Sequence, residues 1–565
     1  MTNTNTSYII NIVVGELAQL ARAPALHAGG QGFESLILHH IFFGKWLNLV
    51  EHLVWDQRVA GSNPVFPTSY YKHYLWYCYF FYLNIKYIRE DKMNNKAITN
   101  RSDDFAKWYT DVVKAAHLAD YSNVKGCIVI EPNGYAIWEE IQKTLDKKFK
   151  ETGHENIYMP LLIPENLMKK ESDLINGFAP EAAWVTIGGT KELEERMCIR
   201  PTSETLFSDY YSRVVSSWRD LPKKYNQWCN VLRWEKETRP FLRSREFLWQ
   251  EGHTIHETSI EAEEETKNML EIYKSLFEDY LAIPVITGRK TEKEKFSGAE
   301  YTLTIEALMQ NGVTLQSGTS HYFGQKFSKA YDISFTNKNK QIDYAYQTSW
   351  GISTRSIGAL IMVHSDDKGL VLPPKIAPTK VIIIPIGTDE KVLNTCTKIK
   401  EELETKGIST KLDSSAKSPG YRFAEAEVNG IPLRIELGAR DLEQGKLTIF
   451  KRDTYEKETI SLNEDIETYI TKELEEMQTR MYNKALVNRE NLTYTCTTLK
   501  EVEDIMNTKP GFIKASWCGN QECEEKMKEI KGTKSRCIID DNPQDKTCIV
   551  CGKEAKHLVV WGIQY

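Results

Sequence analysis

The sequence predicts an α+β protein of several domains, in which an antiparallel sheet flanked by helices precedes a smaller α/β domain and a cysteine-bearing tail. Three observations predict this order. Strand-like runs alternate with one strong helix between Leu193 and Gly358, a strand–helix–strand pattern follows a proline-rich stretch, and five of the 11 cysteines fall between Cys518 and Cys551. A chain of 565 residues is also too long for one hydrophobic core.

The composition is that of an ordinary globular protein, with 41% hydrophobic and 27% charged residues. The net charge of −6 excludes a chain-wide basic field, so any contact with RNA must use local patches. Cysteines scattered singly are typical of reduced thiols. We therefore expect a cytoplasmic protein.

Residues 1–92 differ in composition from the rest of the chain. The run from Tyr70 to Ile88 is long enough for a membrane span, but Lys72, His73 and the many tyrosines argue against one. The pieces "GFES" and "GSNP" can both be reverse-translated to contain GGTTCGAATCC in different frames, which resembles the T-arm of a transfer RNA gene. Chance is the alternative, because codon choice is free. We expect a doubtful extension from a mis-assigned start, with Met93 as the alternative start.

The first elements after Met93 follow from apolar spacing and caps. A helix is predicted over Tyr135–Gly153, because apolar residues recur at helical intervals and Gly153 suits a C-terminal cap. A strand is predicted over Asn156–Pro164, with prolines near and at its end. The strong helix within the antiparallel sheet is expected over Ser259–Leu281.

The stretch from Asn230 to Thr254, "NVLRWEKETRPFLRSREFLWQEGHT", mixes arginines and glutamates with aromatic residues that favour burial. One interpretation is two edge strands whose arginines extend along apolar surface. The other is a strand, a mobile loop and a second strand, with guanidinium groups directed at an anionic ligand such as a nucleotide.

The smaller α/β domain begins after the proline-rich linker Leu370–Lys380. Its predicted elements are, in order, a strand from Val381, a helix over 389–406, a strand over 408–413, a helix from about Tyr421, strands over 433–438 and 446–453, and a long charged helix over 463–488.

Four blocks occur in a fixed order along the chain: "RPTSET" from Arg200, the stretch from Asn230, "LQSGTSHYFGQKFSKAYDISF" from Leu315, and "YAYQTSWGISTRSIGALIMVHSDDKGLVLPP" from Tyr344. Together they closely resemble prolyl-tRNA synthetase of the archaeal and eukaryotic type, from about Met93 to Tyr565. The resemblance implies a class II synthetase catalytic domain over 93–370, a linker over 371–380, an anticodon-binding domain over 381–485 and a cysteine-bearing domain over 486–565.

The implied function is ATP-dependent ligation of L-proline to tRNA(Pro) through a prolyl-adenylate, by a homodimer that uses Mg²⁺. Motif 1, the dimer-forming element of the class, would lie near Pro160 and Pro164, and motifs 2 and 3 would lie at Arg233 and at "GISTRSIG". Two alternatives remain: another class II synthetase such as threonyl-tRNA synthetase, or a synthetase-like RNA-binding protein without catalysis.

The resemblance assigns roles that agree with the chemistry of the side chains. The enzyme must hold a carboxylate beside an α-phosphate, and the guanidinium of Arg233 offers donors to both. Arg233 and Arg355 are the catalytic candidates, through positioning and charge neutralisation. For any single arginine a structural ion pair is the alternative. The ATP-binding candidates are Arg233, Glu235, Arg243, Ser244, Gln316, Thr319, Ser353 and Arg355, with Gln316 acting through a metal ion.

Proline needs an acceptor for its secondary ammonium group and a close-fitting apolar slot. The proline-binding candidates are Thr202, Glu204, Arg233, Trp249 and His321. Ser244 and Ser353 stand where the family pattern leads us to expect threonine, but both keep the hydroxyl group. The stretch between motifs 2 and 3 is too short for an inserted editing domain, so we expect no editing of misactivated alanine in cis.

The tail pairs Cys518 with Cys523 and Cys548 with Cys551, and four thiolates in two close pairs suit a structural zinc site. Cys537 could substitute for one of them, His557 is a weaker candidate, and a reduced tail without metal is the alternative. We expect little apolar core in the tail, so that its fold depends on the ion. The resemblance also implies that Tyr565 packs toward the catalytic domain. The tRNA-contacting candidates of the α/β domain are Glu436, Arg440, Lys446 and Lys451.

Overall fold

A computed structural model describes residues 98–174 and 182–565, which fall within one unit, Lys96–Tyr565. The doubtful extension of residues 1–92 lies outside the described residues. Among the described residues, no helix is both long and apolar enough to cross a membrane.

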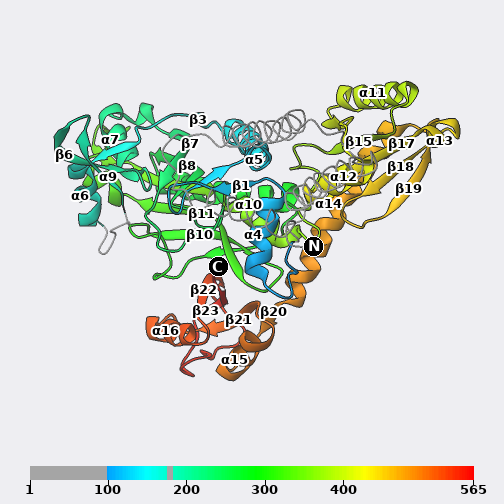
Figure 1. Cartoon of the computed structure of the whole chain (residues 1–565). Coiled ribbons are helices and arrows are strands. Elements are labelled where there is room, and N and C mark those ends of the chain that lie inside the picture. The colour runs from blue at the N-terminus through cyan, green and yellow to red at the C-terminus, as the bar shows by residue number, and fades with distance from the viewer. Residues whose placement is uncertain (1–97, 175–181) are drawn as a thin grey trace, which may run out of the picture. The chain divides into compact units, whose positions relative to one another are not determined.

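The centre of this unit is a sheet of 11 strands in the order β20-β21-β23-β22-β9-β10-β11-β14-β8-β7-β3 (Figure 1). Neighbouring strands from β9 to β7 all pair antiparallel, which confirms the predicted antiparallel sheet. These central strands are β7 (Lys223–Leu232), β8 (Glu246–His256), β9 (Val285–Arg289), β10 (Tyr301–Leu308), β11 (Thr314–Gly324) and β14 (Tyr346–Ser353).

Helices supply the core that packs on this sheet. The predicted helix near 135–153 is confirmed as α5 (Pro132–Glu151), which buries an apolar face and is followed by Gly153 at φ +81°. The helix α8 (Ser259–Ser275) begins at a capping box between Thr258 and Glu261 and ends in a π-helical turn, Leu276–Tyr280. The helices α4 (Phe105–Ala115) and α10 (Arg355–His364) complete this group.

The strand predicted over Asn156–Pro164 is wrong as a single strand. The chain forms β3 (Glu155–Asn156), parallel to β7, and β4 (Leu162–Pro164), antiparallel to β6 (Lys191–Ile199). Between them, Arg200 Nη1 donates to the carbonyl of Met159 at 2.8 Å. This carbonyl therefore accepts from a buried guanidinium and not from a neighbouring strand. Proline also has no N–H to offer a ladder.

Shorter elements of residues 119–344 lie outside the central sheet. They are β1 (Ala119–Tyr121), β2 (Ile128–Ile130), α6 (Glu165–Leu174), β5 (Trp184–Gly188), α7 (Glu204–Val214), the 3₁₀ turn Trp218–Asp220, α9 (Lys326–Ala330), β12 (Ser334–Thr336) and β13 (Ile342–Tyr344).

The α/β domain contains a five-stranded sheet in the order β16-β15-β17-β18-β19, and its predicted strands and helices are confirmed (Figure 1). The strands are β15 (Val381–Ile386), β16 (Thr410–Leu412), β17 (Leu433–Gly438), β18 (Lys446–Lys451) and β19 (Lys457–Ser461), and the helices are α11 (Glu390–Thr405), α12 (Pro419–Val428) and α13 (Ala439–Glu443). The sequence did not predict α13 or β19, which are both short.

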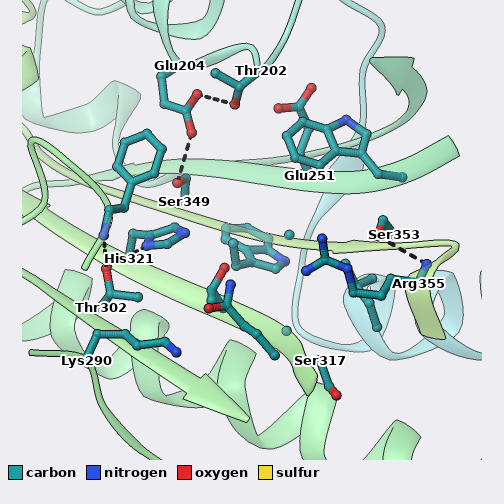
Figure 2. A pocket seen from close by; sticks show the side chains of 18 of the residues that line it. Thr202, Glu204, Glu251, Lys290, Thr302, Ser317, His321, Ser349, Ser353 and Arg355 are labelled. Atoms are coloured by element: carbon teal, nitrogen blue, oxygen red, sulfur yellow. Dashed lines mark hydrogen bonds between the residues drawn. The ribbon is translucent and has the colours of Figure 1, made fainter. Parts of the chain in front are cut away.

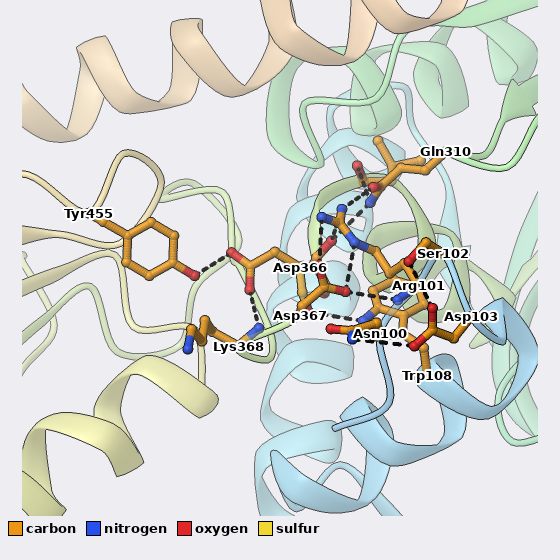
Figure 3. Close-up of polar contacts among 12 residues, drawn as sticks. Asn100, Arg101, Ser102, Asp103, Trp108, Gln310, Asp366, Asp367, Lys368 and Tyr455 are labelled. Atoms are coloured by element: carbon orange, nitrogen blue, oxygen red, sulfur yellow. Dashed lines mark hydrogen bonds and ion pairs between the residues drawn. The ribbon is translucent and has the colours of Figure 1, made fainter. Parts of the chain in front are cut away.

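Polar contacts anchor the α/β domain to the turn after α10 (Figure 3). Asp366 accepts from Arg452 Nη1 at 2.7 Å and from the hydroxyl of Tyr455 at 2.7 Å. The next residue, Asp367, pairs with Arg101 Nε at 3.1 Å. The linker that follows is packed, because Leu370 and Leu372 belong to the main core.

The long charged helix α14 (Ile466–Asn491) runs across the predicted boundary at residue 485 and leads into the tail. The tail folds into β20 (Thr493–Thr495), α15 (Leu499–Thr508), β21 (Phe512–Trp517), α16 (Gln521–Glu529), β22 (Thr533–Asp540) and β23 (His557–Ile563). Its strands extend the central sheet through a bridge between Ile538 of β22 and Arg289 of β9.

The expectation of little apolar core in the tail is wrong. A separate buried cluster includes Trp517, Met527, Val559 and Trp561, each at most 4% exposed. These residues are spread thinly among charged ones in the sequence, and they meet only because α15 and α16 pack against β21–β23.

Candidate active site

A cavity of about 300 Å³ opens over the central strands (Figure 2). It brings together most of the candidates for proline and ATP. The predicted residues that line it are Thr202, Glu204, Arg233, Trp249, Gln316, Thr319, His321, Ser353 and Arg355.

Three ATP candidates lie outside the cavity wall, on the loop that joins β7 to β8. Glu235 donates its backbone N–H to the carbonyl of Arg233 at 2.7 Å, Arg243 is exposed, and Ser244 is buried. The predicted strand, loop and strand are thus observed. The structure does not bring these three side chains to the cavity.

Arg233 leaves the end of β7 and points its guanidinium toward the cavity wall. Its Nε donates to the carbonyl of Pro201 at 3.1 Å, and the guanidinium lies 5.3 Å from the ring centroid of Trp249. Burial lowers the pKa of Arg233, but the group stays cationic at neutral pH. Within the described residues, its Nη atoms make no hydrogen bond, so they can serve a ligand.

Arg355 begins α10 on another wall of the same cavity. Its Nε donates to the carbonyl of Leu242 at 3.1 Å, and its backbone N–H donates to Ser353 Oγ at 3.2 Å. Burial, together with the charges of Arg233 and Arg243, lowers the pKa of Arg355 to about 10. Cations that repel one another across a cavity favour an anion between them.

The acidic wall of the cavity is built at the start of α7. Glu204, which is 6% exposed, accepts a hydrogen bond from the hydroxyl of Thr202 and another from Ser349 Oγ at 3.4 Å. Figure 2 shows these three side chains together on one wall. A carboxylate held in this way can accept from an ammonium group.

Sequence reasoning missed Glu251 and His253, which line the cavity together with Trp249. The three alternate along β8 and therefore face the same side of the sheet. Burial opposes ionisation of Glu251, but hydrogen bonds from His253, Ser203 and Gln227 hold the pKa of this carboxyl below its ordinary value. The alternation of "WQEGH" was the signal that could have found them.

His321 faces the cavity from β11 and is neutral. Burial lowers its pKa to about 3. Its Nδ1 lies 2.8 Å from the hydroxyl of Thr302, and its ring lies 4.9 Å from that of Phe296. A neutral imidazole beside an aromatic ring suits the apolar body of a small substrate.

The cavity wall also contains Lys290, which the sequence analysis did not single out. Its Nζ lies 2.6 Å from Glu306 Oε1, and Arg536 Nε lies 3.1 Å from Glu306 Oε2. All three side chains are buried. No local sequence signal marks this cluster, because Arg536 is far away in the chain.

The four predicted cysteine ligands meet in the tail, with their sulfur atoms within 4.8 Å of one another. Cys518 Sγ lies 3.7 Å from both Cys523 Sγ and Cys551 Sγ. A tetrahedral zinc site with Zn–S bonds of ~2.3 Å has S–S edges of about 3.8 Å, so this donor set fits zinc. Among the described residues, the group leaves out the alternatives Cys537 and His557.

The four tRNA-contacting candidates differ in their surroundings. Glu436 is buried and pairs with Arg434 at 2.8 Å, and Lys451 pairs with Glu473 at 2.7 Å. Arg440 on α13 and Lys446 at the start of β18 are exposed. The structure therefore favours the second pair for contacts with a partner.

Tyr565 does pack back on the catalytic domain. Its backbone N–H donates to the carbonyl of Thr314 at 3.0 Å, and its hydroxyl accepts from Arg239 of the loop between β7 and β8. The last residue of the chain therefore braces the loop that follows Arg233.

Three protein-family models match the chain in order along it. A model described as tRNA synthetase class II core domain (G, H, P, S and T) matches residues 184–364, one described as anticodon binding domain matches 380–473, and one described as prolyl-tRNA synthetase, C-terminal, matches 499–565.

Similar proteins are named proline–tRNA ligase. One from Clostridium novyi is 56% identical over 473 residues, which are 83% of this chain and 98% of that protein. One from Clostridium botulinum is 54% identical over 478 residues, 84% of this chain and 100% of that protein. A protein named proline–tRNA ligase 2, from Bacillus cereus, is 55% identical over 472 residues, 83% of this chain and 99% of that protein.

These relatives come from bacteria, so the archaeal and eukaryotic affiliation expected from the four sequence blocks is not borne out. The blocks contain residues that line the cavity, such as Arg233, His321 and Arg355. Such residues follow the chemistry of the substrates and carry little information about the organism.

Proposed function

This chain belongs to the prolyl-tRNA synthetases of class II, and we propose that the cavity lined by Arg233 and Arg355 is where proline and ATP react. The chain is a proline–tRNA ligase, whose substrates are proline, ATP and tRNA(Pro). The names of the relatives and the C-terminal family model argue against a threonyl-tRNA synthetase. The presence of both arginines argues against a non-catalytic relative.

In the proposed reaction the carboxylate of proline attacks the α-phosphate of ATP, pyrophosphate leaves, and prolyl-adenylate forms. The observation that carries this proposal is the pair of unengaged Nη atoms of Arg233 facing the cavity, with Arg355 across from them. Arg233 would hold both reacting anions, and Arg355 would hold the nucleotide. Rate acceleration would come from positioning and charge neutralisation.

Proline would lie at the acidic end of the cavity. Glu204, supported by Thr202, would accept from the secondary ammonium group. Trp249 and the neutral ring of His321 would enclose the apolar ring of the substrate. Glu251 would add negative potential from the same strand as Trp249.

ATP would lie toward Arg355, with Gln316, Thr319 and Ser353 on the wall around it. Magnesium, when bound, neutralises phosphate charge, and the amide oxygen of Gln316 suits this cation. Glu235, Arg243 and Ser244 lie on the loop after β7, and we propose that they reach the adenine and the outer phosphates when ATP is bound.

Proline-dependent exchange of pyrophosphate into ATP tests this assignment. Arg233→Ala should lower exchange by about 100-fold or more, because the donors to both anions are lost. Arg213→Ala is the control. Arg213 is an exposed arginine of α7 that pairs with Asp209 at 3.1 Å, outside the cavity wall. Near-normal exchange by folded Arg233→Ala protein would overturn the assignment.

We also propose that the enzyme is a homodimer joined through the segment between β3 and β4. In support, Tyr158 and Leu161 of this segment are 68% and 38% exposed, and exposed apolar side chains mark interaction surfaces. Light scattering at micromolar concentration should give twice the mass of one chain. Tyr158→Asp should shift the protein toward the monomer, and a monomeric parent protein would refute the proposal.

Further finer assignments rest on separate observations. The cysteine cluster would hold a structural zinc ion, since its four sulfur atoms lie within 4.8 Å of one another and four thiolates would complete a tetrahedral shell. Arg440 and Lys446 would contact the anticodon region of tRNA(Pro). A cytoplasmic location agrees with the ten free cysteines among the described residues.

A further inference from the structure

A buried cluster of three charges lies beside the cavity. The carboxylate of Glu306 accepts from Lys290 Nζ at 2.6 Å and faces Arg536 Nε at 3.1 Å, and all three side chains are at most 1% exposed. Thr304 adds a hydrogen bond to Glu306 Oε1 at 2.8 Å. Lys290 alone of the four lines the cavity.

The cluster joins two domains. Lys290 follows β9 and Glu306 lies on β10, whereas Arg536 lies on β22 of the tail. The neighbours on either side are paired too: Arg289 binds Asp541 at 2.9 Å, and Thr291 donates to Glu524 at 2.9 Å. The tail is therefore fixed along the segment that positions Lys290.

Charge within the cluster is not balanced. Two cations share one carboxylate, which leaves one positive charge among three almost completely buried side chains. Arg536 Nη1 and Nη2 are buried and have no hydrogen-bond partner among the described residues. Burial lowers the pKa of Lys290, and Arg536 lowers it further, as expected when Glu306 is shared between two cations.

The cluster also lies beside a residue assigned to the nucleotide, because Glu306 of β10 is the cross-strand partner of Gln316 of β11. Arg536 also lowers the pKa of Arg355, by less than burial, Arg233 and Arg243 do. Charges interact strongly in such surroundings because water does not screen them.

We propose that Arg536 is a positioning residue for the nucleotide site, which shares Glu306 with Lys290 and so leaves positive charge at the cavity wall for the phosphates of ATP. If Arg536 were neutral, Glu306 would cancel the charge of Lys290 completely. The tail thereby contributes to ATP binding without touching ATP. This inference rests on the proposed place of ATP in the cavity.

Charge-swap variants of the full-length protein test the inference in pyrophosphate exchange. Arg536→Met removes the surplus charge and should lower kcat/KM for ATP by about tenfold, while KM for proline changes by less than about twofold. Arg536→Lys should keep most of the activity. The double variant Arg536→Met with Glu306→Gln restores one net positive charge and should recover most of the loss.

Two controls separate charge from loss of structure. Arg289→Met breaks the exposed pair with Asp541 at the same domain contact and should leave kcat/KM for ATP unchanged. If Arg536→Met does not fold, the double variant decides, because it must be folded and active. A folded double variant as impaired as Arg536→Met would show that the role is structural and would overturn the inference, as would parental activity in Arg536→Met.

These outcomes are independent of the assignment of the cavity. Failure of that assignment would appear as activity in Arg233→Ala protein. If the present inference fails, Arg233→Ala protein is still inactive, and only the kcat/KM values for ATP of the Arg536 variants differ from those expected.

Discussion

At the scale of single residues, the hydroxyl of Thr302 determines which ring nitrogen of His321, a residue that we propose lines the proline site, carries the proton. Thr302 Oγ1 accepts from the backbone N–H of Phe296 at 3.0 Å and lies 2.8 Å from His321 Nδ1. Thr302 is buried, and among the described residues His321 Nδ1 is the acceptor within reach of its hydroxyl proton, so Thr302 donates to Nδ1. The proton of the neutral ring then lies on Nε2, away from Thr302.

Thr302→Val should therefore raise KM for proline and leave KM for ATP unchanged. The variant keeps the shape of the side chain but loses the hydrogen bonds to Phe296 N–H and to His321 Nδ1. The bond to His321 is worth roughly 0.5–1.5 kcal/mol, or about two- to thirteenfold. Steady-state exchange kinetics with each substrate varied would measure this. Thr302→Ser should behave like the parent protein, and equal changes in both KM values would contradict the tautomer argument.

Two buried histidines, His256 and His321, and the partly buried His364 predict how stability depends on pH. Burial lowers the pKa of His256 to about 4, of His321 to about 3 and of His364 to about 4. In the unfolded chain these groups titrate near 6.5. As the pH falls, the unfolded chain takes up protons first, so stability is complete above about pH 6.5 and declines toward about pH 4.

Denaturant unfolding at several pH values between 7.5 and 5 would measure this slope, with up to about 1.4 kcal/mol per pH unit from each group. His364→Gln should make the slope shallower. His117→Gln is the control, because the side chain of His117 is 69% exposed. If His364→Gln protein loses stability with falling pH as steeply as the parent protein, groups other than His364 cause the loss of stability. Carboxyl groups with lowered pKa, such as Glu251, lose their contribution only at lower pH.

The residues that sequence reasoning found and missed differ in one physical respect. Arg233, His321 and Arg355 stand in motif blocks that can be read locally. Glu251 could have been predicted from the alternation of residues along β8. Lys290 could not have been predicted, because its role depends on a partner from a distant part of the chain.

At the scale of elements, the spacing of apolar residues predicted most helices and strands correctly. It failed where backbone groups form hydrogen bonds with side chains and not with a neighbouring strand. The segment between β3 and β4 is extended but binds Arg200, so no continuous strand forms. The tail was misjudged for another reason. Its apolar residues are few in any window of sequence, and they form a core only by long-range pairing of β21, β22 and β23.

That core changes the expected effect of metal removal. Purified protein should carry about one zinc ion per chain, and Cys518→Ser should lower the zinc content whereas Cys537→Ser should not. A chelator should remove zinc without unfolding the tail, because Trp517 and Trp561 stay buried among apolar neighbours. Elemental analysis and tryptophan fluorescence would report these two effects separately.

The opposite results are equally informative. If Cys537→Ser protein loses zinc, the proposed set of four cysteine ligands is wrong. Full exposure of the tail tryptophans on chelation would show that the ion, and not the apolar cluster, holds the domain.

At the scale of the whole molecule, the described residues between β8 and β14 form no separate domain. The residues after β8 form α8, β9, β10 and β11, which belong to the catalytic sheet and the helix packed on it, followed by α9, β12 and β13. The sequence predicted this from length alone. The continuation of the sheet into the tail was not predictable, since a single bridge between Arg289 and Ile538 makes the join.

Alanine attached to tRNA(Pro) should therefore persist in a purified system. Alanine lacks part of the proline ring, and each missing methylene weakens its binding by only about 1–3 kcal/mol, so some misactivation is expected. Incubating alanyl-tRNA(Pro) with the enzyme and following deacylation would measure the outcome. Uncatalysed hydrolysis in buffer is the control, and faster loss with enzyme present would contradict the expectation.

The place of β22 in the central sheet has a consequence for synthesis on the ribosome. β9 has β10 on one side and β22 on the other, and β22 is translated long after every motif that surrounds ATP. A nascent chain without β22 would hold those motifs beside an open strand edge, with the carboxylate of Glu306 missing one of its two cations. Open edges recruit other strands. Prematurely terminated chains should thus be substrates for chaperones and proteases, not smaller working ligases.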